Sequence, residues 1–101
     1  MSKLVIKEDI IEKQKQTAVF AKALGHPIRL AIIELLDSRS CCYHGDMSNE
    51  LPIAKSTLSQ HLKELKKSGL IQGDISNPPR KYCINRENFA LARSLLCKVL
   101  D

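Results

Sequence analysis

Apolar and polar positions follow a helical period over residues 55–67, and this is the clearest pattern in the chain. Leu58, Leu62 and Leu65 recur at the spacing of one buried helix face. The opposite face carries small polar and basic side chains, namely Ser56, Ser59, Gln60, Lys63 and Lys67. Gly69 follows, where a helix C-terminus favours glycine. The pattern predicts a helix over Lys55–Lys67 that packs through its leucines and presents a polar surface.

The segments on either side of this helix have patterns of their own. Met47–Leu51 predicts a shorter helix, and Pro52 ends it because proline cannot continue a helix. Apolar positions alternate over Leu70–Ile75, and the chain returns over Lys81–Ile84 after a turn at Asn77–Arg80. The sequence therefore predicts a helix-turn-helix over about residues 46–68, followed by a β-hairpin wing over about 70–84.

Three further helices are predicted around this unit. Apolar positions favour helices over Glu8–Leu24 and Ile28–Leu36, with His26 as a turn or N-cap residue between them. Asn85 is a suitable N-cap for a last helix over Arg86–Leu100. The expected fold is mainly α with a small β-wing. It is a winged helix-turn-helix of five helices, with the hairpin between the fourth and the fifth.

The last of these helices has more apolar surface than a small domain covers by itself. Its apolar residues lie on two faces and are Phe89, Ala90, Leu91, Ala92, Leu95, Leu96, Cys97, Val99 and Leu100. Such a surface argues for a partner chain, and most partners are identical copies. We therefore expect a homodimer held together by the helices over about residues 8–24 and 86–100.

Length, charge and hydropathy narrow the range of functions. The 101 residues fit a single domain, expected to span residues 1–101. Sixteen Lys and Arg against eleven Asp and Glu give a net charge of +5, which favours a polyanionic partner. Between Lys55 and Lys81 there are six basic residues and two acidic ones. No apolar run approaches the roughly 18 residues of a membrane span, and the N-terminus lacks a signal-peptide pattern, so we expect a cytoplasmic protein without a membrane partner.

Three motifs in the chain are specific when taken together. They are Ala23-Leu24-Gly25-His26-Pro27-Ile28-Arg29-Leu30, Ser56-Thr57-Leu58-Ser59-Gln60-His61-Leu62, and Lys81-Tyr82 at the end of the wing. With the intervening elements, they resemble the winged-helix transcriptional repressors of the ArsR family of arsenic and metal sensors, from about Val19 to Ile84. The resemblance implies a dimer that places two recognition helices in successive major grooves of a pseudo-palindromic double-stranded DNA site.

The polar face of the Lys55–Lys67 helix has the chemistry to read DNA. Short Ser and Thr side chains let the backbone approach phosphates, Gln can bond adenine through two hydrogen bonds, and Lys reaches guanine or phosphate. Basic residues in the wing would contact the neighbouring backbone or minor groove. The expected DNA-contacting residues, with His61 at the edge of the surface, are Lys55, Ser56, Thr57, Ser59, Gln60, His61, Lys63, Arg80 and Lys81.

Neither metal site that is familiar in the ArsR family carries over to this chain. The thiolate sensors place a Cys-x-Cys pair just before an acidic residue, and here Tyr43 and Gly45 occupy those positions before Asp46. The second site of the family uses carboxylates and histidines of the last helix, which has no histidine here. The resemblance therefore identifies no effector.

A different group of cysteines is predicted near the wing. In winged helices the strand before the helix-turn-helix usually pairs with the second wing strand, which would bring Cys41 or Cys42 near Cys83, with His44 close by. Two or three thiolates with an imidazole suit As(III), Cd(II), Zn(II) or Cu(I). Alternatively, one of the pair forms a redox-switched disulfide with Cys83. The third alternative is packing as small apolar side chains, which we favour for Cys97.

Two other functions stay open on the sequence alone. A winged helix used only for protein–protein contact would have an acidic or apolar recognition face, whereas this face is polar and basic. A cysteine-dependent enzyme would need a nucleophile, a base and an oxyanion site in one pocket, and Cys42 with His44 offers no such set. The expected protein is therefore a DNA-binding transcriptional repressor and not an enzyme.

Overall fold

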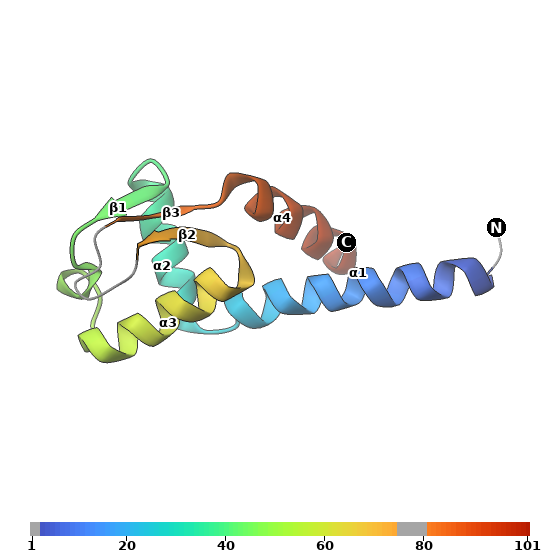
Figure 1. Cartoon of the computed structure of the whole chain (residues 1–101), viewed down its shortest axis with the longest axis horizontal. Helices are drawn as coiled ribbons and strands as arrows, with labels where there is room; N and C mark the ends of the chain where they lie inside the picture. Colours follow the sequence, from blue (N-terminus) through green and yellow to red (C-terminus); the bar gives the residue numbers. More distant parts are fainter. Residues whose placement is uncertain (1–2, 75–80) are drawn as a thin grey trace.

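The chain folds into helices around a small antiparallel sheet (Figure 1). The computed structural model describes residues 3–74 and 81–101. Along the described chain the elements are α1 (Lys3–Leu24), α2 (Pro27–Ser38), β1 (Cys42–His44), a 3-10 turn (Met47–Asn49), α3 (Lys55–Ser68), β2 (Ile71–Asp74), β3 (Lys81–Ile84) and α4 (Arg86–Leu100). This mainly helical architecture with a three-stranded sheet is compatible with the predicted winged helix-turn-helix.

The prediction of a short helix over Met47–Leu51 is wrong, so the described ranges contain four α-helices where five were expected. The segment forms one 3-10 turn, in which the side chain of Asp46 accepts a hydrogen bond from the backbone N–H of Ser48. Two constraints explain the difference. Pro52 disfavours helical dihedrals at the residue before it, and too few residues remain between Asp46 and Pro52 to offset the cost of nucleating an α-helix.

The remaining helices form close to the predicted positions, with one exception at the N-terminus. Helix α1 begins at Lys3 and not at the expected Glu8, because no glycine or proline interrupts the chain between them. The Nδ1 atom of His26 accepts a hydrogen bond from the backbone N–H of Ile28 at 3.1 Å, which confirms the predicted N-cap of α2. Asn85 caps α4 in the same way, also as predicted.

The sheet has the strand order β1-β3-β2, so β3 lies in the middle. Its pairing with β1 places Tyr43 opposite Tyr82, which confirms the expected pairing of the strand before the helix-turn-helix with the second wing strand. Strands β2 and β3 pair antiparallel as the two sides of the predicted hairpin. The predicted hairpin turn at Asn77–Arg80 lies outside the described residues, as does Ile75 at the expected end of the first wing strand.

The core lies between the sheet and the helices, and it includes the leucine stripe of α3. The largest fully buried side chains are Tyr82, Phe20, Ile32, Leu36, Met47, Leu58, Leu62, Leu65, Leu70 and Ile71. The N-terminal half of α1 projects beyond this body, which makes the molecule elongated at 53 × 24 × 22 Å (Figure 1). None of the helices in the described ranges has the length and apolar character that a membrane crossing requires.

Candidate nucleic-acid interface

Helix α3 has one buried face and one exposed face. Leu58, Leu62 and Leu65 are at most 2% exposed, as their spacing predicted. On the opposite side the exposed residues are Lys55, Ser56, Thr57, Gln60 and Lys63, and Ser59 is half-buried beside them. Gly69 ends the helix in a left-handed conformation with φ 89°, which favours glycine. The structure thus brings the predicted contact residues of this helix together on one accessible surface.

His61 lies at the border between the two faces and contacts the protein itself. Its Nδ1 atom accepts a hydrogen bond from Nε of Arg29 at 3.2 Å, and its ring centroid is 4.2 Å from that of His26. Arg29 also donates to the backbone oxygens of Lys22 and Ala23 at 3.0 and 3.2 Å. Burial lowers the pKa of His61, and the nearby His26 and Arg29 lower it further. No local spacing predicts this role of Arg29, because its partners lie in two separate segments, the end of α1 and the middle of α3.

The start of α3 is attached to the turn before it. Lys55 Nζ lies 3.1 Å from Asp46 Oδ2, and hydrogen bonds from Ser48, followed by the contact with Lys55, lower the pKa of Asp46. Ala54 at the N-cap position supplies no side-chain hydrogen bond, so the first N–H groups of the helix have no such cap. The ion pair of Lys55 is exposed and therefore weak, which leaves this lysine able to exchange Asp46 for a phosphate.

A side-chain hydrogen bond holds the wing against α3, and a glycine allows its two strands to lie close together. Lys66 of α3 donates from Nζ to the carbonyl oxygen of Gly73 in β2 at 2.7 Å. Gly73 has φ +126°, and a Cβ atom there would lie 2.4 Å from the carbonyl oxygen of Lys81 in β3, so only glycine fits. The side chain of Lys81 is exposed on this strand, as the predicted contact with DNA requires. Arg80, the other predicted wing contact, lies outside the described residues.

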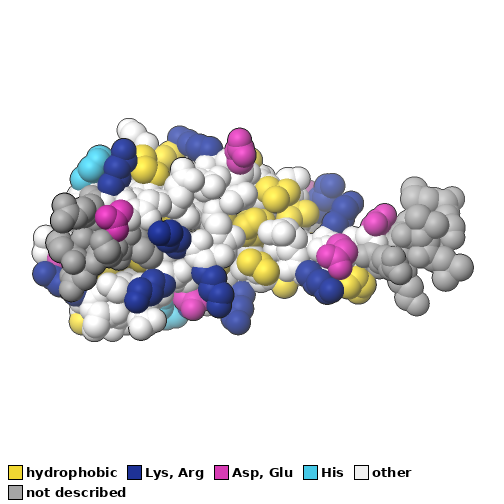
Figure 2. Space-filling view, viewed as in Figure 1, with side chains coloured by type: hydrophobic (Ala, Val, Ile, Leu, Met, Phe, Trp, Pro, Cys, Tyr) yellow, Lys and Arg dark blue, Asp and Glu magenta, His cyan; other side chains and the backbone are white. Residues whose placement is uncertain are grey.

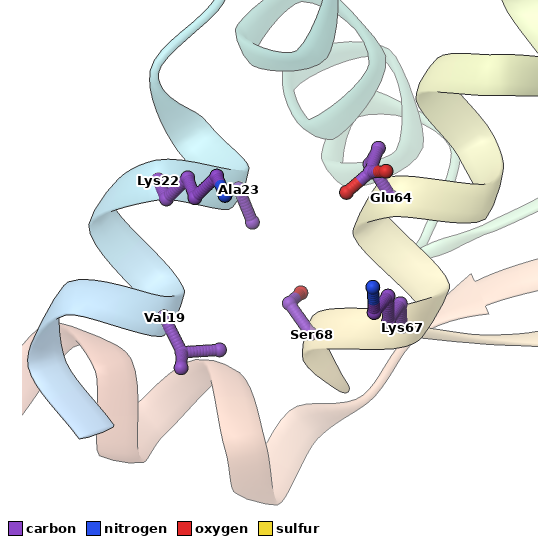
Figure 3. Close-up of a pocket in the computed structure, with 6 residues that line it drawn as sticks. All are labelled: Val19, Lys22, Ala23, Glu64, Lys67 and Ser68. Atoms are coloured by element: carbon purple, nitrogen blue, oxygen red, sulfur yellow. The ribbon is translucent and has the colours of Figure 1, made fainter. Parts of the chain in front are cut away.

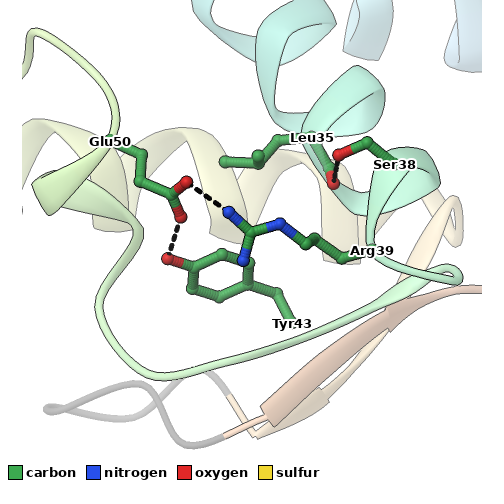
Figure 4. Close-up of polar contacts among 5 residues, drawn as sticks. All are labelled: Leu35, Ser38, Arg39, Tyr43 and Glu50. Atoms are coloured by element: carbon green, nitrogen blue, oxygen red, sulfur yellow. Dashed lines mark hydrogen bonds and ion pairs between the residues drawn. The ribbon is translucent and has the colours of Figure 1, made fainter.

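A polar network connects the sheet with the loop that leads into α3 (Figure 4). The hydroxyl of Tyr43 in β1 donates to Oε2 of Glu50, and the Arg39 guanidinium lies 2.5 Å from Oε1 of the same carboxylate. Burial raises the pKa of Tyr43, and the hydrogen bond to Glu50 raises it further. The ring of Tyr43 also stacks on that of Tyr82 in β3, with 5.9 Å between centroids. The members of this network share no periodic spacing, so the sequence alone did not predict it.

Of the three cysteines predicted to gather near the wing, the structure brings two together. Cys42 lies directly opposite Cys83 in the β1–β3 register, and a disulfide joins them. Cys41 is buried in the core as a free thiol. Within residues 3–74 and 81–101 no three His, Cys, Asp or Glu side chains are placed to hold a metal ion, so the predicted set of two or three thiolates with His44 is not assembled. Cys97 is a free thiol that lies exposed on α4, so this single chain does not provide the packing expected for it.

A hollow of about 310 Å³ separates α1 from the C-terminal half of α3 (Figure 3). Figure 3 shows its lining, which consists of Val19, Lys22, Ala23, Glu64, Lys67 and Ser68. Lys67, assigned to the polar recognition face by its spacing, lies at this hollow.

Comparison with known proteins identifies the family. A family described as a helix-turn-helix domain matches residues 24–73. An HTH-type transcriptional regulator of Mycobacterium tuberculosis is 33% identical over 91 residues, which cover 86% of this chain and 80% of that protein. A second such regulator, from Methanocaldococcus jannaschii, is 36% identical over 62 residues, or 61% of this chain and 70% of the relative. The biofilm growth-associated repressor of Xylella fastidiosa is 30% identical over 66 residues, which cover 65% of this chain and 57% of that protein. This chain therefore belongs to the helix-turn-helix transcriptional regulators, which bind DNA.

Proposed function

We propose that the chain is a sequence-specific repressor of the ArsR type that acts as a homodimer on double-stranded DNA. The observation that carries this proposal is the division of α3 into a buried leucine face and an exposed polar and basic face. The wing beside it supports the same function, because Lys66 fastens β2 to the C-terminal end of α3. Together these elements form one surface for a major groove and its flanking backbone.

The exposed residues of this surface divide into two roles. Ser56, Thr57, Ser59 and Gln60 contact bases and phosphates in the major groove, where a glutamine recognises adenine through two hydrogen bonds. Lys55, Lys63 and Lys81 bind the phosphate backbone. The same role is assigned to Arg80 from the sequence, because this residue lies outside the described ranges. His61 stays at the edge of the surface, because its ring is engaged by Arg29 and His26.

The dimer would form through α1 and α4. These helices expose large apolar side chains, and Figure 2 shows hydrophobic groups gathered where α4 lies beside α1. The exposed side chains are Ile10, Ile11 and Val19 on α1, and Leu91, Val99 and Leu100 on α4. A second copy that covers this surface would also give the projecting half of α1 a partner to pack against.

Dimerisation would set the distance between the two recognition helices. Helix α1 contacts both α4 and α3, so the angle between two copies fixes where each α3 meets the DNA. Two half-sites one helical turn apart require a separation of about 34–36 Å between the recognition helices. An effector that changes the α1–α4 interface would therefore change the fit to the operator.

Fluorescence anisotropy tests DNA recognition. The protein is titrated into a labelled duplex from upstream of its own gene and into a scrambled duplex of the same length and composition. We expect tighter binding to the upstream duplex and an affinity that falls steeply with salt. Equal affinity for both duplexes at every salt concentration would contradict sequence-specific repression and favour a winged helix that binds another protein.

Sedimentation equilibrium tests the dimer separately. Ile11→Glu places a charge in the apolar surface of α1 and should shift the protein from dimer to monomer. Gln16→Glu is the matched control, because it adds the same charge at an exposed polar position of the same helix. A monomeric wild type, or a dimer unaffected by Ile11→Glu, would rule out this interface.

A further inference from the structure

We propose that Cys42 and Cys83 form a thiol–disulfide exchange site whose redox state sets the DNA affinity of the protein. This inference rests on the DNA-binding function proposed above. Cys42 in β1 and Cys83 in β3 lie directly opposite each other, and the disulfide joins residues 41 positions apart in sequence. A DNA-binding protein works in a compartment where thiols are kept reduced. Disulfides that form there are usually catalytic or redox-sensing and not structural.

The site is open to a small thiol from one side. Cys42 is half-buried and lines a hollow of about 480 Å³, together with Ser38, Arg39, Ser40, Tyr43 and His44. The side chain of Arg39, which lines this hollow, is 51% exposed, so the approach to Cys42 is open to solvent. Neither of the two free cysteines takes part, since Cys41 is buried in the core and Cys97 lies on α4.

The chemistry needs a low-molecular-weight thiol in one direction and a hydroperoxide in the other. A thiolate attacks Sγ of Cys42, forms a mixed disulfide and releases Cys83 as a thiolate, which takes up a proton. A second thiol then displaces Cys42, so that two thiols become one disulfide and the protein gains two electrons and two protons. In the reverse direction, a hydroperoxide oxidises the two protein thiols to the disulfide and leaves as an alcohol and water.

The disulfide is coupled to the recognition helix through the neighbouring pair of residues in the two strands, Tyr43 and Tyr82. The register that pairs Cys42 with Cys83 also pairs Tyr43 with Tyr82, whose rings stack. The Tyr43 hydroxyl donates to Glu50, and Glu50 lies in the loop that leads into α3 at Lys55. The covalent bond therefore holds the wing strand β3 against the strand and loop that position the start of α3.

Oxidation should strengthen DNA binding. With the disulfide formed, β1 and β3 keep one register, so the wing and α3 meet the DNA as a preorganised unit. Reduction removes the covalent link and leaves β1, a strand of three residues, attached to β3 by non-covalent contacts alone. The wing and the Glu50 loop then gain freedom that DNA binding must remove. We expect the reduced protein to bind the upstream duplex about tenfold more weakly, within the usual range of coupling between linked sites.

Intrinsic fluorescence measures the exchange without DNA. The chain has two tyrosines and no tryptophan, and both tyrosines lie in the two strands joined by the disulfide. Titration with a glutathione redox buffer should give a reversible change in tyrosine emission. Alkylation with N-ethylmaleimide followed by peptide mapping should label Cys42 and Cys83 only after reduction. In Cys42→Ser the emission change should vanish, whereas Cys97→Ser should keep it.

Anisotropy then compares oxidised and reduced protein on the same upstream duplex. Cys42→Ser should bind like reduced wild type in both buffers, and Cys97→Ser should respond like wild type. Tyr43→Phe keeps the strand and the cysteines but removes the hydroxyl that donates to Glu50. It should still form the disulfide, with a ratio of oxidised to reduced affinity close to one. Retention of the full ratio in Tyr43→Phe would contradict this route of coupling.

The outcomes separate this inference from the proposed function. Failure of Cys42 and Cys83 to form a disulfide in oxidising buffer would overturn the exchange site, whatever the protein binds. Reversible exchange with equal DNA affinity in both states would overturn its control of DNA binding and leave repression intact. Reversible exchange in a protein that binds no duplex selectively would overturn the repressor function and, with it, the redox control of DNA affinity, while confirming the exchange site.

Discussion

Arg29 donates a hydrogen bond from Nε to Nδ1 of His61 over 3.2 Å and so connects α2 with the recognition helix across 32 positions of sequence. The same guanidinium donates to the carbonyl oxygens of Lys22 and Ala23 at the end of α1. One side chain therefore fixes α3 relative to the helix through which we expect the dimer to form. Changes at this junction should alter both stability and the geometry of DNA binding.

Removal of the guanidinium should weaken this junction. Arg29→Ala leaves His61 Nδ1 and the carbonyl oxygen of Ala23 without their donor in a partly buried position. We expect the free energy of unfolding to fall by about 1–3 kcal/mol in urea denaturation. Arg93→Ala removes an exposed arginine from α4 and should change it by about 0.5 kcal/mol or less. Equal losses in the two variants would show that the Arg29 contacts contribute nothing specific.

The lowered pKa of His61 predicts a loss of stability in mild acid. Burial first, and then the charges of His26 and Arg29, disfavour protonation in the folded state. The unfolded chain therefore binds the proton at a higher pH than the folded one, so the free energy of unfolding falls as the pH drops below about 6.5. His61→Asn keeps an acceptor but does not titrate, and it should flatten this slope between about pH 7 and pH 5. An unchanged slope in His61→Asn would show that this histidine does not cause the loss of stability in acid.

Two glycines with positive φ should respond differently to alanine. Gly73→Ala strains the backbone and also places Cβ 2.4 Å from the carbonyl oxygen of Lys81, so the wing strands must separate. Gly45→Ala meets nothing within 4 Å and adds only the backbone strain at φ +99°, about 1–2 kcal/mol. Thermal unfolding should rank Gly73→Ala as the less stable variant, and only Gly73→Ala should weaken DNA binding. The opposite order would contradict the close approach of β2 and β3.

Two substitutions of exposed residues should distinguish a contact with a base from a contact with the DNA backbone. Gln60→Ala removes a donor and acceptor suited to a base edge, and it should reduce the preference for the upstream duplex by about 1–3 kcal/mol. Lys81→Ala should weaken binding to every sequence and lower the slope of log affinity against log salt by about 1. Anisotropy titrations of both variants from low to moderate salt make the comparison. If both bind like the wild type, α3 and the wing are not the DNA-binding surface.

Reduction of the Cys42–Cys83 disulfide should lower stability whether or not DNA is bound. The bond closes a loop with a sequence separation of 41, which restricts the unfolded chain. Loops of this size give about 2–4 kcal/mol, measured as the difference between urea unfolding with and without a reductant. The double variant C42S/C83S should match the reduced protein and show no further loss on adding reductant. A double variant as stable as the oxidised wild type would mean that the bond does not stabilise the fold.

The sequence by itself determined those elements whose signals lie within a few residues. The leucine stripe of α3, the N-caps at His26 and Asn85, and the left-handed Gly69 were all predicted and found. Each depends on a local period or on a hydrogen bond to a near neighbour along the chain. The division of α3 into buried and exposed faces, from which the DNA-contacting surface was inferred, follows from the same local signal.

Tertiary structure decided the features that depend on distant segments. The choice of Cys42 and not Cys41 as the partner of Cys83 depends on strand register, since a shift of one residue reverses which side chains share a face. The Arg29–His61 hydrogen bond depends on how two helices pack, and no spacing in the sequence encodes it. Met47 is buried, yet its segment forms a 3-10 turn, because Asp46 and Pro52 leave too little chain for a helix. Periodicity describes one element at a time, whereas register, packing and the fit of short connections follow only once the elements are assembled.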